Sequence, residues 1–304
     1  MIAVLFPGQG AQTPGMLTPW LALPGVASHL RELSNATDTD LIAHGTSSDA
    51  DTIRDTAIAQ PLLVAAGLAT AREALGDTIP GLVAGHSVGE LGAAALAGVI
   101  DDAEAMRLVA VRGRAMAAAA AAAEPTSMAA VLGGVEEDVL DRLDQLGLTP
   151  ANINGGGQIV AAGARAGIEA LVADPPARTR VIALQVAGAF HTSYMQPAVA
   201  ALAEATAFAE PRDPKLKLLT NADGTEVTTG HDALDRIVAQ VANPVRWDLC
   251  QARMLELGVT AILEVAPGGV LTGLAKRSLK GVPAVALKTP DDLPAARELL
   301  EQHA

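Results

Sequence analysis

Aromatic residues are scarce in this sequence of 304 residues, because phenylalanine, tryptophan and tyrosine together make up only 2% of it. Half of the residues are nevertheless apolar, so the core must be built mainly from alanine, valine, leucine and isoleucine. Charged residues amount to 18%. This composition is typical of a globular chain and excludes an intrinsically disordered one. The length predicts about two domains, or one large domain that carries an insertion.

Positive charge is also in short supply. The sequence has 21 lysines and arginines against 34 acidic residues, which gives a formal net charge of −13. A nucleic-acid-binding surface needs a basic field, so this balance excludes nucleic acid as a partner.

The sequence also has only one cysteine and no long hydrophobic run. The single cysteine, Cys250, excludes an internal disulfide framework and fits a reducing compartment. The apolar run Met116–Ala123 is far shorter than the roughly 20 residues that span a bilayer. The run Ile2–Phe6 ends at Pro7, and no basic segment precedes it, so it does not resemble a secretory signal. We therefore expect a cytoplasmic protein with no membrane partner.

Apolar periodicity predicts alternating strands and helices. Strands are expected at Ile2–Phe6 and Leu82–Ala84, and helices at Ile58–Leu75, Val88–Leu96 and Asp101–Ala123. The last of these helices includes an alanine tract, which has high helix propensity.

The middle of the chain has a different order. Between residues 125 and 191 the predicted elements are strand, helix, strand, strand, helix and strand, which is the order of a ferredoxin-like unit. A rhythm of helices and strands resumes afterwards and ends with a strand at Ala284–Leu287. We therefore expect an α/β fold in two parts. A large discontinuous domain would span residues 1–124 and 192–304, and a small inserted domain would span residues 125–191.

A candidate nucleophile lies between the strand at Leu82–Ala84 and the helix after it. The sequence there, Gly85-His86-Ser87-Val88-Gly89, matches the G-x-S-x-G pattern of a nucleophile elbow. In such a turn the serine projects at the first turn of a helix, where the helix dipole favours a developing negative charge. The same serine and Glu90 also match a capping box that could open an ordinary helix. Both interpretations can hold together.

His191 is the candidate general base. A serine nucleophile needs a base within hydrogen-bond reach, and in elbow enzymes that base follows the serine in the chain. His191 lies between a predicted strand and a predicted helix, where the small domain would rejoin the large one, and such junctions form clefts. His231 lies in a polar loop, and His303 lies at a chain end that we expect to be frayed.

Cofactor and metal motifs are missing. A dinucleotide loop that began at Gly8 would need a glycine at position 13, where the sequence has Thr13. No cluster of histidine, cysteine and glutamate has metal-ligand spacing. We expect neither a cofactor nor a metal.

Five motifs occur in a characteristic order along the chain. They are Phe6-Pro7-Gly8-Gln9-Gly10-Ala11-Gln12, Gly85-His86-Ser87-Val88-Gly89-Glu90, Val111-Arg112-Gly113-Arg114, Gly188-Ala189-Phe190-His191 and Gln240-Val241-Ala242-Asn243-Pro244-Val245. Together they resemble the malonyl-CoA:acyl carrier protein transacylase family of fatty-acid synthesis. The resemblance runs from Ile2 to about Lys288. It implies a hydrolase-like α/β core with a ferredoxin-like insert, which is the fold expected above. The implied partners are malonyl-CoA, as a substrate, and acyl carrier protein, and we expect a monomer.

The resemblance also implies roles for single residues. Ser87 would be acylated, with His191 as its base. The backbone N–H groups of Gln9 and Val88 would form the oxyanion hole, and Arg112 would hold the malonyl carboxylate. The remaining two implied residues are Gln240, which would orient His191 through its carbonyl, and Asn154, at the edge of the site.

Two of these assignments have chemical support. Arginine offers a planar pair of donors to a carboxylate, and acetyl, which lacks the carboxylate, would leave a buried Arg112 unmatched. Taken alone, Arg112 could equally be a solvated charge on its helix. Phe190 directly precedes the histidine. In related polyketide acyltransferases phenylalanine there goes with malonyl and serine with methylmalonyl, because the ring leaves no room for an α-methyl group.

Three alternatives remain open at this stage. They are a discrete polyketide acyltransferase, a serine esterase and a non-catalytic carrier-binding module. A transferase also needs a docking surface for an acidic carrier, and the densest basic cluster contains Lys276, Arg277 and Lys280. We expect this cluster to dock the carrier, although it could be only the solvated end of a helix.

Overall fold

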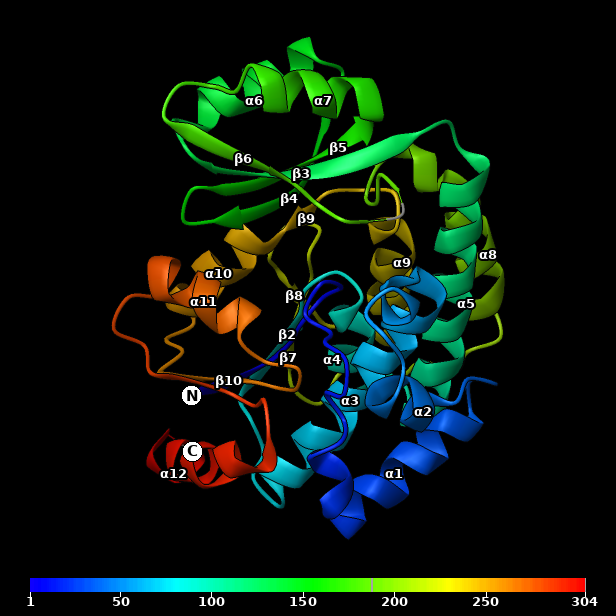
Figure 1. The fold of residues 1–304 in the computed structure, drawn as a ribbon. Helices are drawn as coiled ribbons and strands as arrows, with labels where there is room; N and C mark the ends of the chain where they lie inside the picture. The colour runs from blue at the N-terminus through cyan, green and yellow to red at the C-terminus, as the bar shows by residue number, and fades with distance from the viewer. Residues whose placement is uncertain (187, 304) are drawn as a thin grey trace.

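The computed structural model describes residues 1–186 and 188–303, which form two β-sheets with helices around them (Figure 1). The strands are β1 (Ile2–Phe6), β2 (Leu82–Gly85), β3 (Thr126–Gly133), β4 (Thr149–Gly155), β5 (Gln158–Ala164), β6 (Thr179–Ala183), β7 (Lys217–Leu219), β8 (Glu226–Val227), β9 (Val245–Arg246), β10 (Ala261–Glu264) and β11 (Ala284–Ala286). The α-helices are α1 (Pro24–Asn35), α2 (Leu41–Thr46), α3 (Thr56–Leu75), α4 (Gly89–Leu96), α5 (Asp102–Ala122), α6 (Glu136–Gln145), α7 (Arg165–Ala173), α8 (Gln196–Thr206), α9 (Gly230–Gln240), α10 (Trp247–Glu256), α11 (Val270–Ser278) and α12 (Leu293–His303). Short 3-10 turns are η1 (Trp20–Ala22), η2 (Thr52–Arg54), η3 (Ser193–Met195) and η4 (Pro290–Asp292).

The larger sheet has six strands in the order β11-β10-β1-β2-β7-β8. All neighbours in it are parallel except β7 and β8. Every residue of β1 is buried, as expected for an apolar strand that is covered on both faces. Two separate groups of buried side chains flank β1. Ile2, Val4 and Phe6 point into one group, and Ala3 and Leu5 point into the other.

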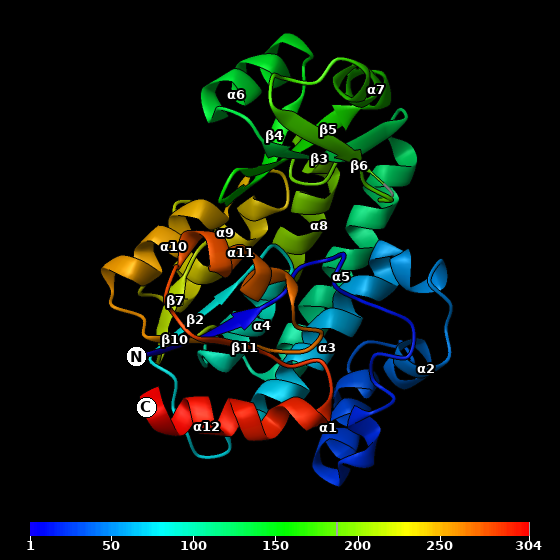
Figure 2. The same cartoon turned by 60° about the vertical axis from the view of Figure 1, so that its left-hand side comes forward.

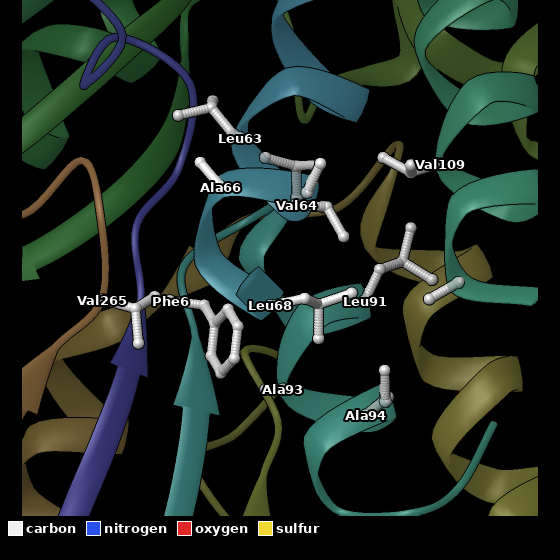
Figure 3. Packing of buried hydrophobic residues seen from close by; sticks show 14 of the residues in the cluster. Phe6, Leu63, Val64, Ala66, Leu68, Leu91, Ala93, Ala94, Val109 and Val265 are labelled. Carbon is white, nitrogen blue, oxygen red and sulfur yellow. The ribbon is translucent and has the colours of Figure 1, made fainter. Parts of the chain in front are cut away.

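Small residues let the helices approach this sheet closely, and the ring of Phe6 illustrates the effect. A Cβ atom on Gly67 of α3 or on Gly92 of α4 would lie 2.8 or 2.5 Å from that ring. Figure 3 shows Phe6 pointing into the cluster that α3 and α4 line with leucine, valine and alanine side chains. Burial of one such aromatic side chain contributes about 1.5–3 kcal/mol.

The smaller sheet has five strands in the order β6-β3-β5-β4-β9. The predicted chain order of strand, helix, strand, strand, helix, strand is confirmed in β3, α6, β4, β5, α7 and β6. These four strands are antiparallel, and α6 and α7 cover their outer face (Figure 1). The fifth strand, β9, comes from a later part of the chain and pairs in parallel with β4. The two sheets are therefore joined by β9 as well as by the chain at both ends of the small unit.

Several boundaries differ from those expected. The helix predicted to end in the alanine tract is confirmed as α5. Apolar periodicity predicts the last strand of the small unit over Arg180–Val186, but that strand, β6, spans Thr179–Ala183. We expected His303 in a frayed end, but it belongs to α12, whose buried side chains include Leu299 and Leu300. Figure 2 shows α12 running below the large sheet, with both termini on the same side of the molecule.

Among residues 1–186 and 188–303, no helix combines the length and the apolar character that crossing a membrane requires.

Candidate active site

Ser87 occupies a tight turn between β2 and α4. Its φ of 54° is positive, which is unusual for a residue with a side chain. Two glycines make the turn possible. A Cβ atom on Gly85 would lie 2.0 Å from the carbonyl carbon of Gly89, and one on Gly89 would lie 2.3 Å from the oxygen of Phe6. This is the strand–turn–helix context that a nucleophile elbow requires. The capping box does not form, because Val88 is the N-cap of α4 and no side chain caps the helix.

Ser87 lies beside His191, as the sequence predicts. Ser87 Oγ is 2.7 Å from His191 Nε2, and His191 Nδ1 is 2.8 Å from the main-chain oxygen of Gln240. A carbonyl can only accept, so Nδ1 carries the proton and Nε2 presents a lone pair to the serine hydroxyl. Ser87 and His191 both have a positive φ, so each is held in a backbone conformation that only its surroundings can maintain.

Burial keeps the imidazole of His191 neutral. The side chain is nearly inaccessible, and its pKa falls from 6.5 to about 3 because burial and the nearby positive charge of Arg112 disfavour the protonated form. The Gln240 carbonyl acts in the opposite direction but is the weaker influence. His191 is therefore ready to accept a proton at neutral pH.

Arg112 is buried at the same site, although taken alone it could have been a solvated charge. It is 1% exposed. Within the described residues its guanidinium donates to Gln60 Oε1 at 2.7 Å, to Gln240 Oε1 at 2.8 Å and to Ser87 Oγ at 3.5 Å, and all three acceptors are uncharged. Its Nε has no partner there. Burial lowers the pKa of Arg112 to about 10, so the group is still a cation at neutral pH. A buried cation that is held by neutral amides can bind an anion.

A second layer of polar groups surrounds the elbow. The Ser87 N–H donates to Asn221 Oδ1 at 2.7 Å, and Asn221 Nδ2 donates to the oxygen of Gly85 at 2.8 Å. The Gln240 amide donates to the oxygen of Ser87 at 3.0 Å and to the carboxylate of Glu90. Our sequence reading missed Asn221 and Gln60. A short polar segment directly after a buried strand was the available signal for Asn221.

Ser87 and His191 open onto a cavity of about 310 Å³ between the two sheets, and Gln60, which accepts from Arg112, lines the same cavity. Its lining includes Ser87, His191, Gln9, Phe190 and Asn154, all of which were proposed from the sequence. Four of them come from the loops after β1, β2 and β6, and Asn154 comes from β4 of the small sheet.

Two neighbours of the reacting pair have structural contacts of their own. Asn154 Oδ1 is 2.8 Å from His86 Nε2, and His86 packs edge-on against Trp247. Burial lowers the pKa of His86. His86 thus contacts Asn154 of the small sheet, whereas the histidine nitrogen bonded to Ser87 Oγ is that of His191.

The remaining predicted residues lie at the margin of the cavity or on the surface. Val88 is buried at the start of α4, next to Ser87. Lys276, Arg277 and Lys280 are exposed at the end of α11. The first residues of that helix, Val270 and Leu271, line the cavity, so α11 runs from the cavity to the basic cluster.

Residues 4–292 of this chain match a family model that is described as "Acyl transferase domain". The malonyl CoA-acyl carrier protein transacylase of Mycobacterium tuberculosis is 54% identical over 297 residues, which cover 96% of this chain and 98% of that protein. A crystal structure of the enzyme from the same organism has a TM-score of 0.94 at 52% identity, and the match covers 98% of this chain and 99% of that one. This chain belongs to the malonyl-CoA:acyl carrier protein transacylase family. It is an acyltransferase.

Another relative of the family is seen with a partner. It is a malonyl-transacylase solved in complex with its type II PKS acyl-carrier protein. It has a TM-score of 0.91 and 33% identity, and the match covers 98% of this chain and 99% of that chain. Family membership agrees with the resemblance that the five motifs carry.

The described residues contain no group of three or more histidine, cysteine, aspartate or glutamate side chains that could hold a metal ion.

Proposed function

We propose that this chain transfers a malonyl group from malonyl-CoA to the pantetheine thiol of an acyl carrier protein through an ester on Ser87, and so supplies extender units for fatty-acid synthesis. The observation that carries this proposal is the arrangement of Ser87 Oγ, which has a neutral histidine at 2.7 Å and the buried Arg112 cation at 3.5 Å. The names of the relatives support the two substrates.

The first half of the reaction acylates the enzyme. His191 Nε2 takes the proton of the Ser87 hydroxyl as the oxygen attacks the thioester carbonyl of malonyl-CoA. The Gln240 carbonyl keeps the imidazole in the required tautomer and stabilises the imidazolium that forms. When the tetrahedral intermediate collapses, the carbon–sulfur bond breaks, the thiol leaves with the proton from His191, and a malonyl ester remains on Ser87.

The oxyanion of this step would accept hydrogen bonds from the backbone N–H groups of Gln9 and Val88. Val88 stands at the N-terminus of α4, where the helix dipole favours negative charge. The Gln9 side chain donates to Thr56 Oγ1 at 3.2 Å, which fixes the loop after β1 against α3. The position of Val88 and the contact of Gln9 both support an oxyanion hole that is formed before the substrate binds.

Arg112 would pair with the terminal carboxylate of the malonyl group. A carboxylate gives this buried cation a charged acceptor, whereas an acetyl group gives it none, so acetyl-CoA should be the poorer substrate. Phe190 lines the same cavity and would crowd an α-methyl group, which disfavours methylmalonyl-CoA.

In the second half of the reaction the carrier thiol attacks the ester by the reverse path, so the kinetics should be ping-pong. The carrier would dock on the patch of Lys276, Arg277 and Lys280 at the end of α11. Gly156, in the turn between β4 and β5, packs on this patch, since a Cβ atom there would lie 2.8 Å from Arg277 Cβ. The solved complex of a relative with its PKS carrier supports a polyketide carrier as the second candidate.

The same proposal extends to architecture and setting. The six-stranded sheet would be a hydrolase-like core of residues 1–124 and 192–304, and residues 125–191 would form a ferredoxin-like insert. The order β6-β3-β5-β4 in the small sheet supports this division. We further propose a monomer in the cytoplasm that needs no cofactor, with the CoA thioester as a substrate.

Intact mass spectrometry tests the reaction directly. The chain is incubated with malonyl-CoA, acetyl-CoA or methylmalonyl-CoA and then chased with carrier protein. We expect a malonyl adduct that the carrier removes, little adduct with the other two thioesters, and none in Ser87→Ala. Labelling that persists in Ser87→Ala would refute the ester, release of free malonate without a carrier would indicate an esterase, and an unlabelled chain would indicate a non-catalytic carrier-binding module.

A further inference from the structure

Glu90 is a buried carboxylate for which the proposed reaction has no use. It lies in the first turn of α4 and is 3% exposed. Its Oε1 accepts the backbone N–H of Asn221, and its Oε2 accepts the side-chain amide of Gln240. Burial of a carboxylate is costly unless hydrogen bonds compensate for the lost water. Both oxygens are satisfied by groups that in turn contact the reacting residues, so Glu90 is connected to the site at two points.

The Gln240 side chain is the first connection. Its Nε2 donates to Glu90 and to the main-chain oxygen of Ser87, and its Oε1 accepts from Arg112. An amide can rotate by half a turn and exchange its oxygen and nitrogen. An ionised carboxylate only accepts, so Glu90 holds the nitrogen on its own side and directs the oxygen toward Arg112. Without that preference the amide could present its NH₂ group to the Arg112 guanidinium, which also only donates.

Asn221 is the second connection. Glu90 accepts its N–H, while its side chain accepts the Ser87 N–H at 2.7 Å and donates to the oxygen of Gly85 at 2.8 Å. Asn221 is wholly buried. Through Asn221, Glu90 therefore also supports the strained turn of Ser87.

We propose that Glu90 is a positioning residue for malonyl recognition, which fixes the orientation of the Gln240 amide and thereby gives Arg112 the geometry that accepts a carboxylate. This proposal rests on the proposed function, since it requires Arg112 to bind the malonyl carboxylate. The second connection, through Asn221, maintains the elbow and would serve every acyl group alike.

The variant Glu90→Gln tests the orientation. Its amide oxygen can still accept from Asn221, so the elbow keeps its support, but its NH₂ group faces Gln240 and favours the rotated amide. We expect the KM for malonyl-CoA to rise about tenfold or more, with a small change in kcat. The rate of acylation by acetyl-CoA should stay within about twofold, so the preference for malonyl over acetyl falls about tenfold. An unchanged preference, or equal losses on both thioesters, would overturn the proposal.

Asp102→Asn is the matched control. Asp102 is a largely buried carboxylate on α5, the same helix that carries Arg112, and it is bound to His29 and Arg72. It lies ten residues before Arg112 in the sequence, or about 15 Å along a helix axis. Its loss should lower the thermal stability and leave the malonyl preference unchanged. A preference that falls as far as in Glu90→Gln would show that any buried carboxylate has this effect, and the proposal would fail.

A double-mutant cycle separates positioning from general destabilisation, and its Gln240→Ala variant alone still tests the connection if Glu90→Gln does not fold. Gln240→Ala keeps the carbonyl that holds His191 but removes the amide, so it should reduce the malonyl preference as Glu90→Gln does. The double variant should lose no more of the malonyl preference than Gln240→Ala alone, because both changes break the same connection. Additive losses, or a Gln240→Ala variant that keeps its preference, would refute the connection.

Arg112→Ala distinguishes the two proposals. If that variant still prefers malonyl-CoA, the carboxylate assignment in the proposed function fails. If it loses the preference while Glu90→Gln keeps it, only the role of Glu90 fails.

Discussion

All residues of β1 and β2 in the six-stranded sheet are buried, whereas none of the five residues of β6 in the five-stranded sheet is fully buried. Both sheets border the same cavity, but they contribute differently to it. The large sheet carries the turn of Ser87, and its helices carry Arg112 and Gln240. The small sheet contributes lining residues such as Met128, Asn154 and Val160. The proposed reacting and binding groups Ser87, Arg112 and Gln240 are thus carried by the unit whose central strands are fully buried, and the small sheet, whose edge strand β6 is exposed, would only enclose the substrate.

Glycine substitutions should give the largest contrast between the two regions. Gly85→Ala places a Cβ atom 2.0 Å from the Gly89 backbone, so we expect a loss of about 3 kcal/mol or more in the free energy of unfolding, together with the activity. Gly147, before β4, also has a positive φ, but a Cβ atom there meets nothing within 4 Å. Gly147→Ala should cost only about 1 kcal/mol. Urea unfolding of both variants measures the difference, and similar losses would contradict the contrast.

Arg112→Ala should have the next largest effect. It removes the buried cation, so kcat/KM for malonyl-CoA should fall about 100-fold or more, while acetyl-CoA gains relative to it. Steady-state kinetics with both thioesters measures the ratio. Equal losses on both would show that the carboxylate binds elsewhere.

The pH dependence should separate the titration of Glu90 from that of His191. His191, with its pKa at about 3, stays neutral as the pH falls, so acylation by acetyl-CoA should be constant from about pH 8 to about pH 5. Burial raises the pKa of Glu90 to about 7, against the hydrogen bond of Asn221 and the charge of Arg112. Below that pH Glu90 takes up a proton and can itself donate, so the preference for malonyl-CoA should decline. Single-turnover acylation across this range checks both, and an inflection near pH 6.5 with acetyl-CoA would contradict the assignment of His191.

A smaller effect is expected in the small sheet. Asn154→Ala removes the partner of His86 but leaves Ser87, His191 and Arg112 untouched, so kcat/KM should fall about three- to fivefold. The malonyl preference should not change. A loss as large as that of Arg112→Ala would mean that the small sheet helps to place the reacting groups.

The smallest effect on acylation should come from the surface. Reversal of charge at Lys276 and Arg277 should raise the KM for the carrier about tenfold at low salt, less at high salt, and leave acylation by malonyl-CoA unchanged. Arg31→Glu is the control, because Arg31 is exposed on α1, and α1 and α11 lie on opposite sides of the molecule in Figure 1. If both variants weaken the carrier equally, docking follows total charge and not this patch.

The sequence predicted those parts of the molecule whose signals are local. The strand Ile2–Phe6, the long helix with the alanine tract and the elbow at Ser87 each depend on neighbours in the chain. The position of His191 next to Ser87 followed from motif order, and the structure confirms the contact. The two-residue strands β8 and β9 were missed, because pairs this short exist only through partners far away in the sequence.

The polar layer behind the site was hidden for a similar reason. Asn221 contacts Ser87 across 134 positions, and Gln240 contacts Glu90 across 150. A motif named Gln240 only for its carbonyl, and a polar segment after a buried strand was the one local signal for Asn221. Neither pattern shows which partners the two side-chain amides would contact. Glu90 was visible, but its spacing from Ser87 suggested a helix cap, whereas tertiary contacts turned its carboxylate toward Gln240 and Asn221.

Small side chains lie where α5 meets the loop of His191, and they limit how far the loop can move relative to the helix. A Cβ atom on Gly188 would lie 2.6 Å from that of Ala120, so the loop with the base rests almost directly on the helix that carries Arg112. Long, flexible side chains at this contact would let the two parts drift. Because the two backbones are in close contact, the loop and the helix have little room to move. The distance between His191 and Arg112 is therefore fixed. If Arg112 binds the malonyl carboxylate as proposed, this fixed distance would select an acyl group by its length as well as by its charge.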